Sequence, residues 1–102
     1  MAQPIEDLTV NDVVHHNVAV VSSKTPSEML VLDINGDACF AFRGPSARIW
    51  ELLETPICIG DLVDRLVEEY AVETVDCRNE VLAHLNKLRL EGILAVVTPT
   101  VR

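Results

Sequence analysis

Apolar residues follow two different patterns along the chain, and the change falls near residue 44. Before it, β-branched and aromatic residues gather in short runs, which predict strands at residues 13–21, 29–34 and 38–42. After it, apolar residues recur three and four positions apart, which predicts helices at residues 46–54, 59–70 and 75–91. The chain is therefore expected to form strands first and helices afterwards.

The sharpest local signal is Asn35-Gly36, between the second and third predicted strands. This pair supplies the positive φ angles of a type I′ turn, so it predicts an antiparallel hairpin. With a two-residue turn, Ile34 and Asp37 would close the hairpin as a hydrogen-bonded pair. Because pairing alternates along antiparallel strands, the backbone groups of Asp37, Cys39 and Ala41 would then point toward the second strand. Those of Ala38, Phe40 and Phe42 would point outward.

The helix ends carry their own signals. Pro45 fits the first position of the first helix, where no backbone donor is needed, and Thr55-Pro56 lies just beyond its end. Gly92 is the expected cap of the third helix. The short apolar run at residues 93–97 is compatible with a final strand, and Trp50 is expected to anchor the core.

Length and element order together predict one domain. A chain of 102 residues supports a single modest core. We expect a loosely held lead-in at residues 1–12, the domain at 13–97 and a tail at 98–102. The predicted fold is α+β, with a three-stranded antiparallel sheet followed by a three-helix cluster. A short turn between the second and third helices makes this arrangement winged helix-turn-helix-like.

Composition disfavours two classes of partner. The net charge is −8, from 16 acidic and 8 basic residues, whereas binding to nucleic acid is driven by Lys and Arg. No apolar run approaches the roughly 20 residues that span a bilayer. The N-terminus lacks the basic and apolar regions of a signal peptide. A cytoplasmic protein that binds neither membrane nor nucleic acid is expected.

No group of residues predicts catalysis, a metal site or a cofactor. The three cysteines are far apart and form no Cys-x-x-Cys pair. His15 and His16 are strand neighbours, whose side chains point to opposite faces. Cys77 and His84 would lie about 10 Å apart along a helix axis, beyond the reach of a nucleophile and its base.

Several spaced motifs resemble those of one protein family. They are Phe40-Ala-Phe42, then Ser46-Ala-x-Ile-Trp-Glu-Leu-Leu53, Leu62-Val-x-x-Leu-x-x-x-Tyr70 and Glu80-Val-x-x-His-Leu-x-x-Leu-x-x-x-Gly-Ile-Leu94. Taken together over residues 13–97, this order resembles the PqqD-like family, also called RiPP recognition elements. Three positions depart from the family pattern. Arg43 replaces a frequent Asn, Cys58 replaces Ser or Thr, and His84 replaces a bulky apolar residue.

The resemblance implies a non-catalytic protein that binds the leader of a ribosomally made precursor peptide. The leader would add as a strand beside the third strand, in a groove shared with the third helix. The implied peptide-binding residues are Asp37, Ala38, Cys39, Phe40, Ala41, Phe42, Glu80, Val81, Ala83, His84 and Lys87. The third strand contains neither Lys nor Pro, the residues that usually protect an exposed edge, which agrees with this role. An edge covered by the chain's own tail or by a second copy is the structural alternative.

The resemblance leaves the biosynthetic setting open. Lasso-peptide systems use such elements beside a separate leader protease and cyclase, and pyrroloquinoline quinone systems use one beside a radical enzyme. We favour the lasso setting because the N-terminal strand region resembles those members. The alternative of another class is a winged-helix DNA-binding regulator, but the third helix carries no net positive charge.

Overall fold

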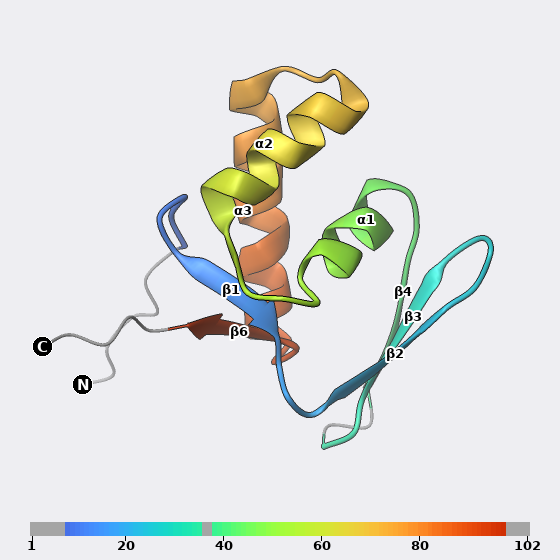
Figure 1. Ribbon diagram of the computed structural model, residues 1–102. Coiled ribbons are helices and arrows are strands. Elements are labelled where there is room, and N and C mark those ends of the chain that lie inside the picture. Colours follow the sequence, from blue (N-terminus) through green and yellow to red (C-terminus); the bar gives the residue numbers. More distant parts are fainter. Residues whose placement is uncertain (1–7, 36–37, 98–102) are drawn as a thin grey trace, which may run out of the picture.

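The computed structural model describes residues 8–35 and 38–97 of the chain. Figure 1 shows strands at both lower sides of the molecule and three helices above and between them. In chain order the elements are β1 (Val13–His16), β2 (Val20–Lys24), β3 (Met29–Asp33), β4 (Ala38–Phe42), α1 (Pro45–Leu52), β5 (Ile57–Cys58), α2 (Ile59–Tyr70), α3 (Thr74–Leu90) and β6 (Leu94–Val97). The α+β class expected from the sequence is confirmed.

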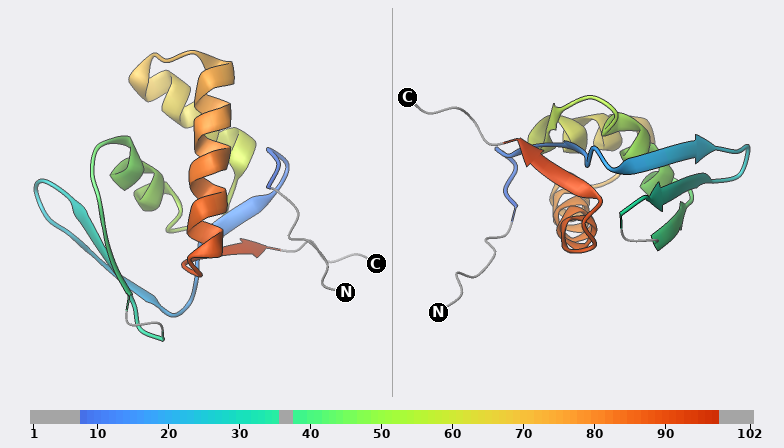
Figure 2. Two further views of the ribbon diagram at one scale, coloured as in Figure 1. Left: turned by 180° about the vertical axis from the view of Figure 1, so that it is seen from behind. Right: turned by 90° about the horizontal axis from the view of Figure 1, so that it is seen from below.

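The strands form two antiparallel sheets, of order β5-β1-β6 and β2-β3-β4. The run expected as one strand at residues 13–21 is divided between these sheets, so that expectation was wrong. Asn17 is the reason, because its side chain donates to the Gly92 carbonyl and accepts from the Ala19 amide. These bonds form a local turn that redirects the chain. The two sheets lie apart on either side of the helices (Figure 2).

The sheet around β1 joins distant parts of the chain. β6 pairs with β1 over the register from Val13–Val97 to His16–Leu94, which confirms the final strand suggested by the sequence. β5 pairs with the other edge of β1 and is too short to leave a sequence signal. The amides of Ile59 and Gly60 then donate to the Asp12 and Val10 carbonyls, which ties the start of α2 to the chain before β1.

The helices follow their predicted bounds closely. α2 spans the predicted residues, and α1 and α3 begin one residue earlier than expected. Gly92 has φ +85° just beyond α3, as a C-terminal cap requires. Ala71 occupies the same left-handed region after α2, with φ +53°. This second cap carries a side chain that disfavours the conformation.

The core is formed where all three helices meet both sheets. Trp50 has no exposed surface, and its indole N–H donates to the Ser22 hydroxyl at 2.7 Å. The His16 ring stacks on Trp50, with ring centroids 3.9 Å apart. α3 contributes Val81, Leu85 and Leu88 to the core. Val81 was expected among the peptide-binding residues, but its side chain is buried in the core, whereas the neighbouring Leu82 is only partly buried.

The segment before β1 packs against the domain from Leu8 onward. The Leu8 side chain is 4% exposed, and its amide donates to the Asn86 side chain of α3. Residues 8–12, expected to be loosely held, therefore belong to the folded unit. Residues 1–7 and 98–102, the other parts of the predicted lead-in and tail, lie outside the described residues.

Candidate functional site

The edge of β4 is the first candidate surface. In the sheet β2-β3-β4, this strand pairs with β3 on one side, and no described strand pairs with its other side. Its side chains are small or aromatic, so the edge has no Lys or Pro to discourage pairing. An uncovered edge of this kind offers unpaired backbone groups to another strand.

Two backbone hydrogen bonds determine which groups of β4 face outward. The Ile34 amide donates to the Ala19 carbonyl, and the Thr25 amide donates to the Glu28 carbonyl. Both bonds continue the register of the β2–β3 pair, so the even-numbered residues of the β3 region point toward β2. The odd-numbered residues of β3 therefore point toward β4.

The register of β3 and β4 agrees with the sequence prediction, but the alternation of hydrogen bonds is reversed. The pairs Asp33–Ala38 and Val31–Phe40 must be the hydrogen-bonded ones, because Asp33 and Val31 point toward β4. The outward backbone groups are consequently those of Cys39 and Ala41. The expectation that those of Ala38, Phe40 and Phe42 point outward was wrong.

The cause of the reversal lies at the turn. Ile34 already uses its amide on the β2 side, so it cannot close the hairpin against Asp37. The Asn35 amide also donates to the Asp33 side chain. The Asn-Gly type I′ turn was inferred from residues 35–36, and Gly36 and Asp37 lie outside the described residues.

Aromatic rings connect the inner face of β4 to the helices. Phe40 and Phe42 stack with centroids 6.2 Å apart, and Phe42 lies 5.6 Å from the Trp50 ring. Phe42 also meets His84 of α3 edge to face at 5.9 Å. The end of β4 thus contacts α3 directly, although Phe42 was expected to contribute its backbone rather than its ring.

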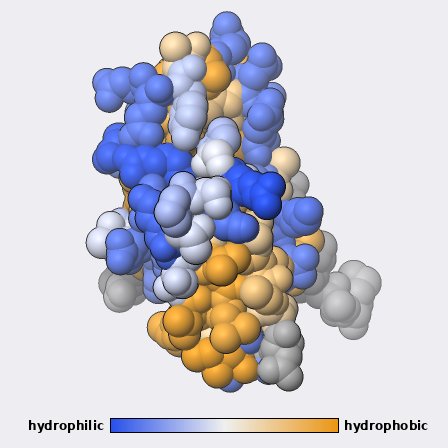
Figure 3. All heavy atoms as spheres, turned by 90° about the vertical axis from the view of Figure 1, so that its right-hand side faces the viewer, coloured by the Kyte–Doolittle hydropathy of each residue, from blue (hydrophilic) through white to orange (hydrophobic). Residues whose placement is uncertain are grey.

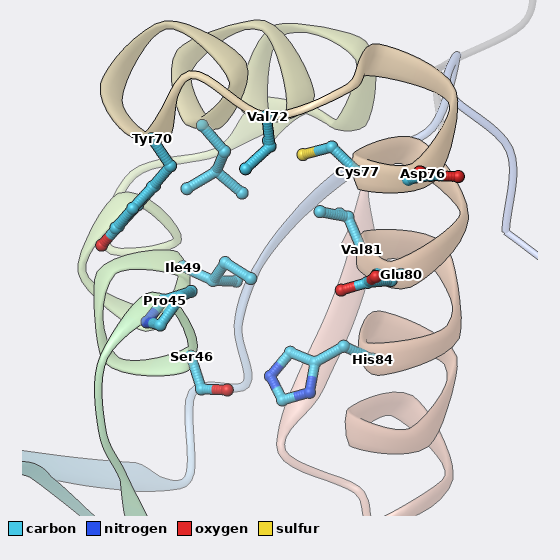
Figure 4. Close-up of a pocket in the computed structure, with 11 residues that line it drawn as sticks. Pro45, Ser46, Ile49, Tyr70, Val72, Asp76, Cys77, Glu80, Val81 and His84 are labelled. Carbon is cyan, nitrogen blue, oxygen red and sulfur yellow. The ribbon is translucent and has the colours of Figure 1, made fainter.

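A pocket of about 370 Å³ lies beyond this contact, between α1, α2 and α3. We call it the interhelical pocket (Figure 4). Its floor consists of the buried residues Ile49, Leu66 and Val81. The other residues that line the pocket are Pro45, Ser46, Tyr70, Val72, Asp76, Cys77, Glu80 and His84.

Glu80 and His84 are polar lining residues that α3 contributes to the interhelical pocket. In Figure 4 the His84 ring points from α3 toward Ser46 of α1, and the Glu80 carboxylate lies above that ring, close to α3. The Nε2 atom of His84 is buried and lacks a hydrogen-bond partner among the described residues. Burial and the nearby Lys87 charge lower the pKa of His84, so its imidazole is neutral at pH 7. Burial and the Glu80 charge raise the pKa of Cys77, which keeps its thiol protonated.

The residues implied by the family resemblance fall into three groups. Glu80, Val81 and His84 line the interhelical pocket. Ala38 to Phe42 form the β4 strand, but none of its residues lines that pocket. Ala83 and Lys87 are exposed on α3 outside the lining.

Sequence reasoning missed the part of the pocket contributed by α1 and α2. Pro45, Ser46 and Tyr70 were expected only as ends of helices, and Val72 was given no role. Their shared surface arises from how the helices cross, which no local spacing reveals. Cys77 was considered only for catalysis and lies in this wall.

A second exposed surface, in the part of the chain that the structure describes, is the outer face of the β2-β3-β4 sheet. Figure 3 shows an apolar patch over the lower part of this side of the molecule. Exposed apolar side chains of this face are Val21, Leu30, Leu32 and Ile34. They point away from the core, so this patch is separate from the interhelical pocket.

Metal and membrane sites find no support in the described part of the chain. No three residues of the types His, Cys, Asp and Glu come together there in a way that could hold a metal ion. Within the same residues, each helix is too short or too polar to cross a membrane.

Comparison with known proteins identifies the family. The model of the family described as coenzyme PQQ synthesis protein D (PqqD) matches residues 28–94, about two thirds of the sequence. The chain belongs to the PqqD family. The matched region of this PqqD-family chain runs from the turn before β3 into β6, so it includes both the β4 edge and the interhelical pocket. No curated protein matches the chain significantly.

Two solved structures share the fold of this PqqD-family chain. One is TbiB1 in complex with the TbiA(beta) leader peptide, with a TM-score of 0.74 and 23% identity, covering 83% of this chain and 99% of that chain. The other is lasso peptide synthetase B1 complexed with the leader peptide, with a TM-score of 0.67 and 20% identity, covering 80% of this chain and 96% of that chain. Both extend the similarity to nearly the whole length of those chains.

Proposed function

We propose that this PqqD-family chain is a non-catalytic protein that binds the leader of a ribosomally synthesised precursor peptide. The leader adds as a strand along the open edge of β4, and the chain presents it to separate maturation enzymes. The observation that carries this proposal is the outer edge of β4, which pairs with no strand of residues 8–35 and 38–97 and whose outward backbone groups belong to Cys39 and Ala41. Strand addition takes its affinity from such main-chain groups.

The lasso setting is the form of this function that we favour. Both structures of similar fold contain a leader peptide, and one is a lasso peptide synthetase B1. In that setting the partners are a leader protease and a cyclase. A radical enzyme of quinone-cofactor biosynthesis is the alternative partner, which the PqqD family description favours.

Amide hydrogen exchange of the ¹⁵N-labelled chain tests strand addition directly. The probes are synthetic peptides from short open reading frames near the gene for this chain, tested as candidate leaders. In the free protein we expect the Ala38 and Phe40 amides to be protected and the Cys39 and Ala41 amides to exchange rapidly. Adding the leader should protect Cys39 and Ala41, because their N–H groups then donate to the new strand.

Two further outcomes separate this function from its alternatives. If a saturating concentration of leader left the exchange rates of the Cys39 and Ala41 amides unchanged, pairing at this edge would be ruled out. Purified chain should not cleave the precursor but should accelerate its cleavage by a separate leader protease. A salt-dependent shift with duplex DNA would support the DNA-binding regulator instead.

A further inference from the structure

We propose that the interhelical pocket takes a long basic side chain, arginine or lysine, from the bound peptide. This inference rests on the proposed function, since it names one residue class that the peptide strand must carry. The pocket begins where β4 ends, because Pro45 and Ser46 of its wall follow β4 closely in the chain. The last residue of β4, Phe42, also meets the lining residue His84 edge to face at 5.9 Å. A peptide strand that extends beyond the end of β4 would then reach the pocket.

The shape of the pocket suits an extended aliphatic stem. Ile49, Leu66 and Val81 form a buried apolar floor, and each is 5% exposed or less. Pro45 and Val72 extend this apolar surface toward solvent. Arginine and lysine can lay their methylene groups on such a surface while the charged head stays at the rim.

The charges of the pocket favour a cation over other long side chains. Among its lining residues, Glu80 and Asp76 are acidic and none is Lys or Arg, although the Asp76 carboxylate points away from the cavity in Figure 4. His84 is neutral at pH 7, and Lys87, whose charge acts on His84, lies outside the lining. Neither carboxylate forms an ion pair with a described residue. In Figure 4 the Glu80 carboxylate lies close to α3, on the side of that helix that faces α1. An acidic peptide residue would be repelled here.

Two more groups can interact with the charged head of a basic side chain. The unpartnered Nε2 atom of His84 can accept a hydrogen bond from a cationic N–H when the proton of the neutral ring lies on Nδ1. The Tyr70 ring, 42% exposed at the rim, offers a face for a cation–π contact. An aliphatic side chain would cover the apolar floor but would form no polar contact with Glu80 or His84.

The experiment selects random linear peptides from a display library against the immobilised chain. Parallel selections use wild type, Glu80→Gln, Glu91→Gln and Ala41→Pro. Glu91→Gln is the matched control, because it removes the same charge from a residue at the end of α3 that does not line the pocket. Ala41→Pro removes an outward donor of β4, and a thermal melt checks that it folds.

Peptides that bind wild type but not Ala41→Pro depend on the β4 edge, and these should carry Arg or Lys at one fixed position. For a selected peptide, replacing that arginine by citrulline keeps its shape but removes its charge. We expect this replacement to weaken binding about tenfold to wild type and to Glu91→Gln, as measured by fluorescence polarisation. With Glu80→Gln the same replacement should change the affinity less than about twofold, because the partner charge is already absent.

Failure of this inference is distinguishable from failure of strand addition. If peptides lose binding to Ala41→Pro but show an apolar residue, or no preference, at that position, the basic side chain is excluded while strand addition stands. An equal citrulline effect on wild type and Glu80→Gln would also exclude it. If the library yields no peptide whose binding depends on Ala41, both proposals fail.

Discussion

His84 of α3 meets Phe42 of β4 edge to face, with ring centroids 5.9 Å apart and an interplanar angle of 81°. This contact joins the last residue of the candidate edge strand to the wall of the interhelical pocket. It also removes water from the imidazole ring, which is half-buried. His84 therefore contacts the edge strand β4 and also lines the interhelical pocket.

The buried imidazole of His84 should make the fold less stable at acid pH. Its pKa is lowered in the folded chain by burial and by the Lys87 charge, whereas the unfolded chain has the ordinary value near 6.5. The unfolded state then binds more protons below about pH 6.5, so the free energy of unfolding falls as the pH drops toward the folded pKa. We expect urea denaturation to show a smaller loss between pH 7.5 and 5 for His84→Leu than for wild type.

A control for this prediction is available at His16. Burial also lowers the pKa of His16, although its hydrogen bond to the Trp50 carbonyl opposes the shift. The free energy of unfolding of His84→Leu should therefore still depend on pH, because His16 is retained. Identical pH dependence in wild type and His84→Leu would show that His84 titrates as it does in the unfolded chain.

Two alanine-to-proline changes in β4 should have opposite effects. Ala38 is paired with Asp33 through its inward backbone groups, so Ala38→Pro removes a ladder bond. Its free energy of unfolding should fall by about 1 kcal/mol or more. Ala41→Pro removes only an outward donor, so its thermal melt should stay close to that of wild type. Leader binding, followed by fluorescence polarisation, should weaken in Ala41→Pro.

This pair of variants also tests the alternation of hydrogen bonds in the hairpin. A stable Ala38→Pro beside an unfolded Ala41→Pro would restore the alternation predicted from the Asn-Gly turn. Equal leader affinity of wild type and a folded Ala41→Pro would instead leave the alternation intact and exclude the β4 edge as the binding surface.

Ala71→Gly should stabilise the chain. Ala71 ends α2 in the left-handed region with φ +53°, and its amide donates to the Val67 carbonyl. Glycine adopts this conformation without the steric cost of a Cβ atom. We expect a gain of about 0.5–1 kcal/mol in urea denaturation. Gly92→Ala, the converse change at φ +85°, should destabilise the chain by a similar amount.

Trp50→Phe should destabilise the domain strongly. The substitution removes the indole N–H that donates to Ser22 and leaves space beside the stacked His16 ring. We expect the free energy of unfolding to fall by about 2 kcal/mol or more, from the lost hydrogen bond and the cavity together. Ser22→Ala removes the same hydrogen bond without creating the cavity. Its free energy of unfolding should fall by about 1 kcal/mol, because solvent reaches the exposed Ser22 site.

Local patterns were enough to predict the helices and most of the strands. The bounds of α2 follow from apolar spacing, and the cap at Gly92 follows from the conformational freedom of glycine. The pairing of Asp33 with Ala38 follows from the position of the turn residues. Each of these features depends on neighbouring residues, so the sequence by itself determined them, together with the PqqD family resemblance.

Only the tertiary structure decided which surface is open and which groups it offers. Ile34 could have bonded to either neighbouring strand, and its bond to Ala19 reversed the alternation along β4. The interhelical pocket likewise needs Ser46, Tyr70 and Glu80 from three different helices. A backbone amide or a helix face has several partners of similar local quality, and contacts between distant segments select among them. The outward amides of β4 and the pocket beyond its end are therefore properties of the folded chain.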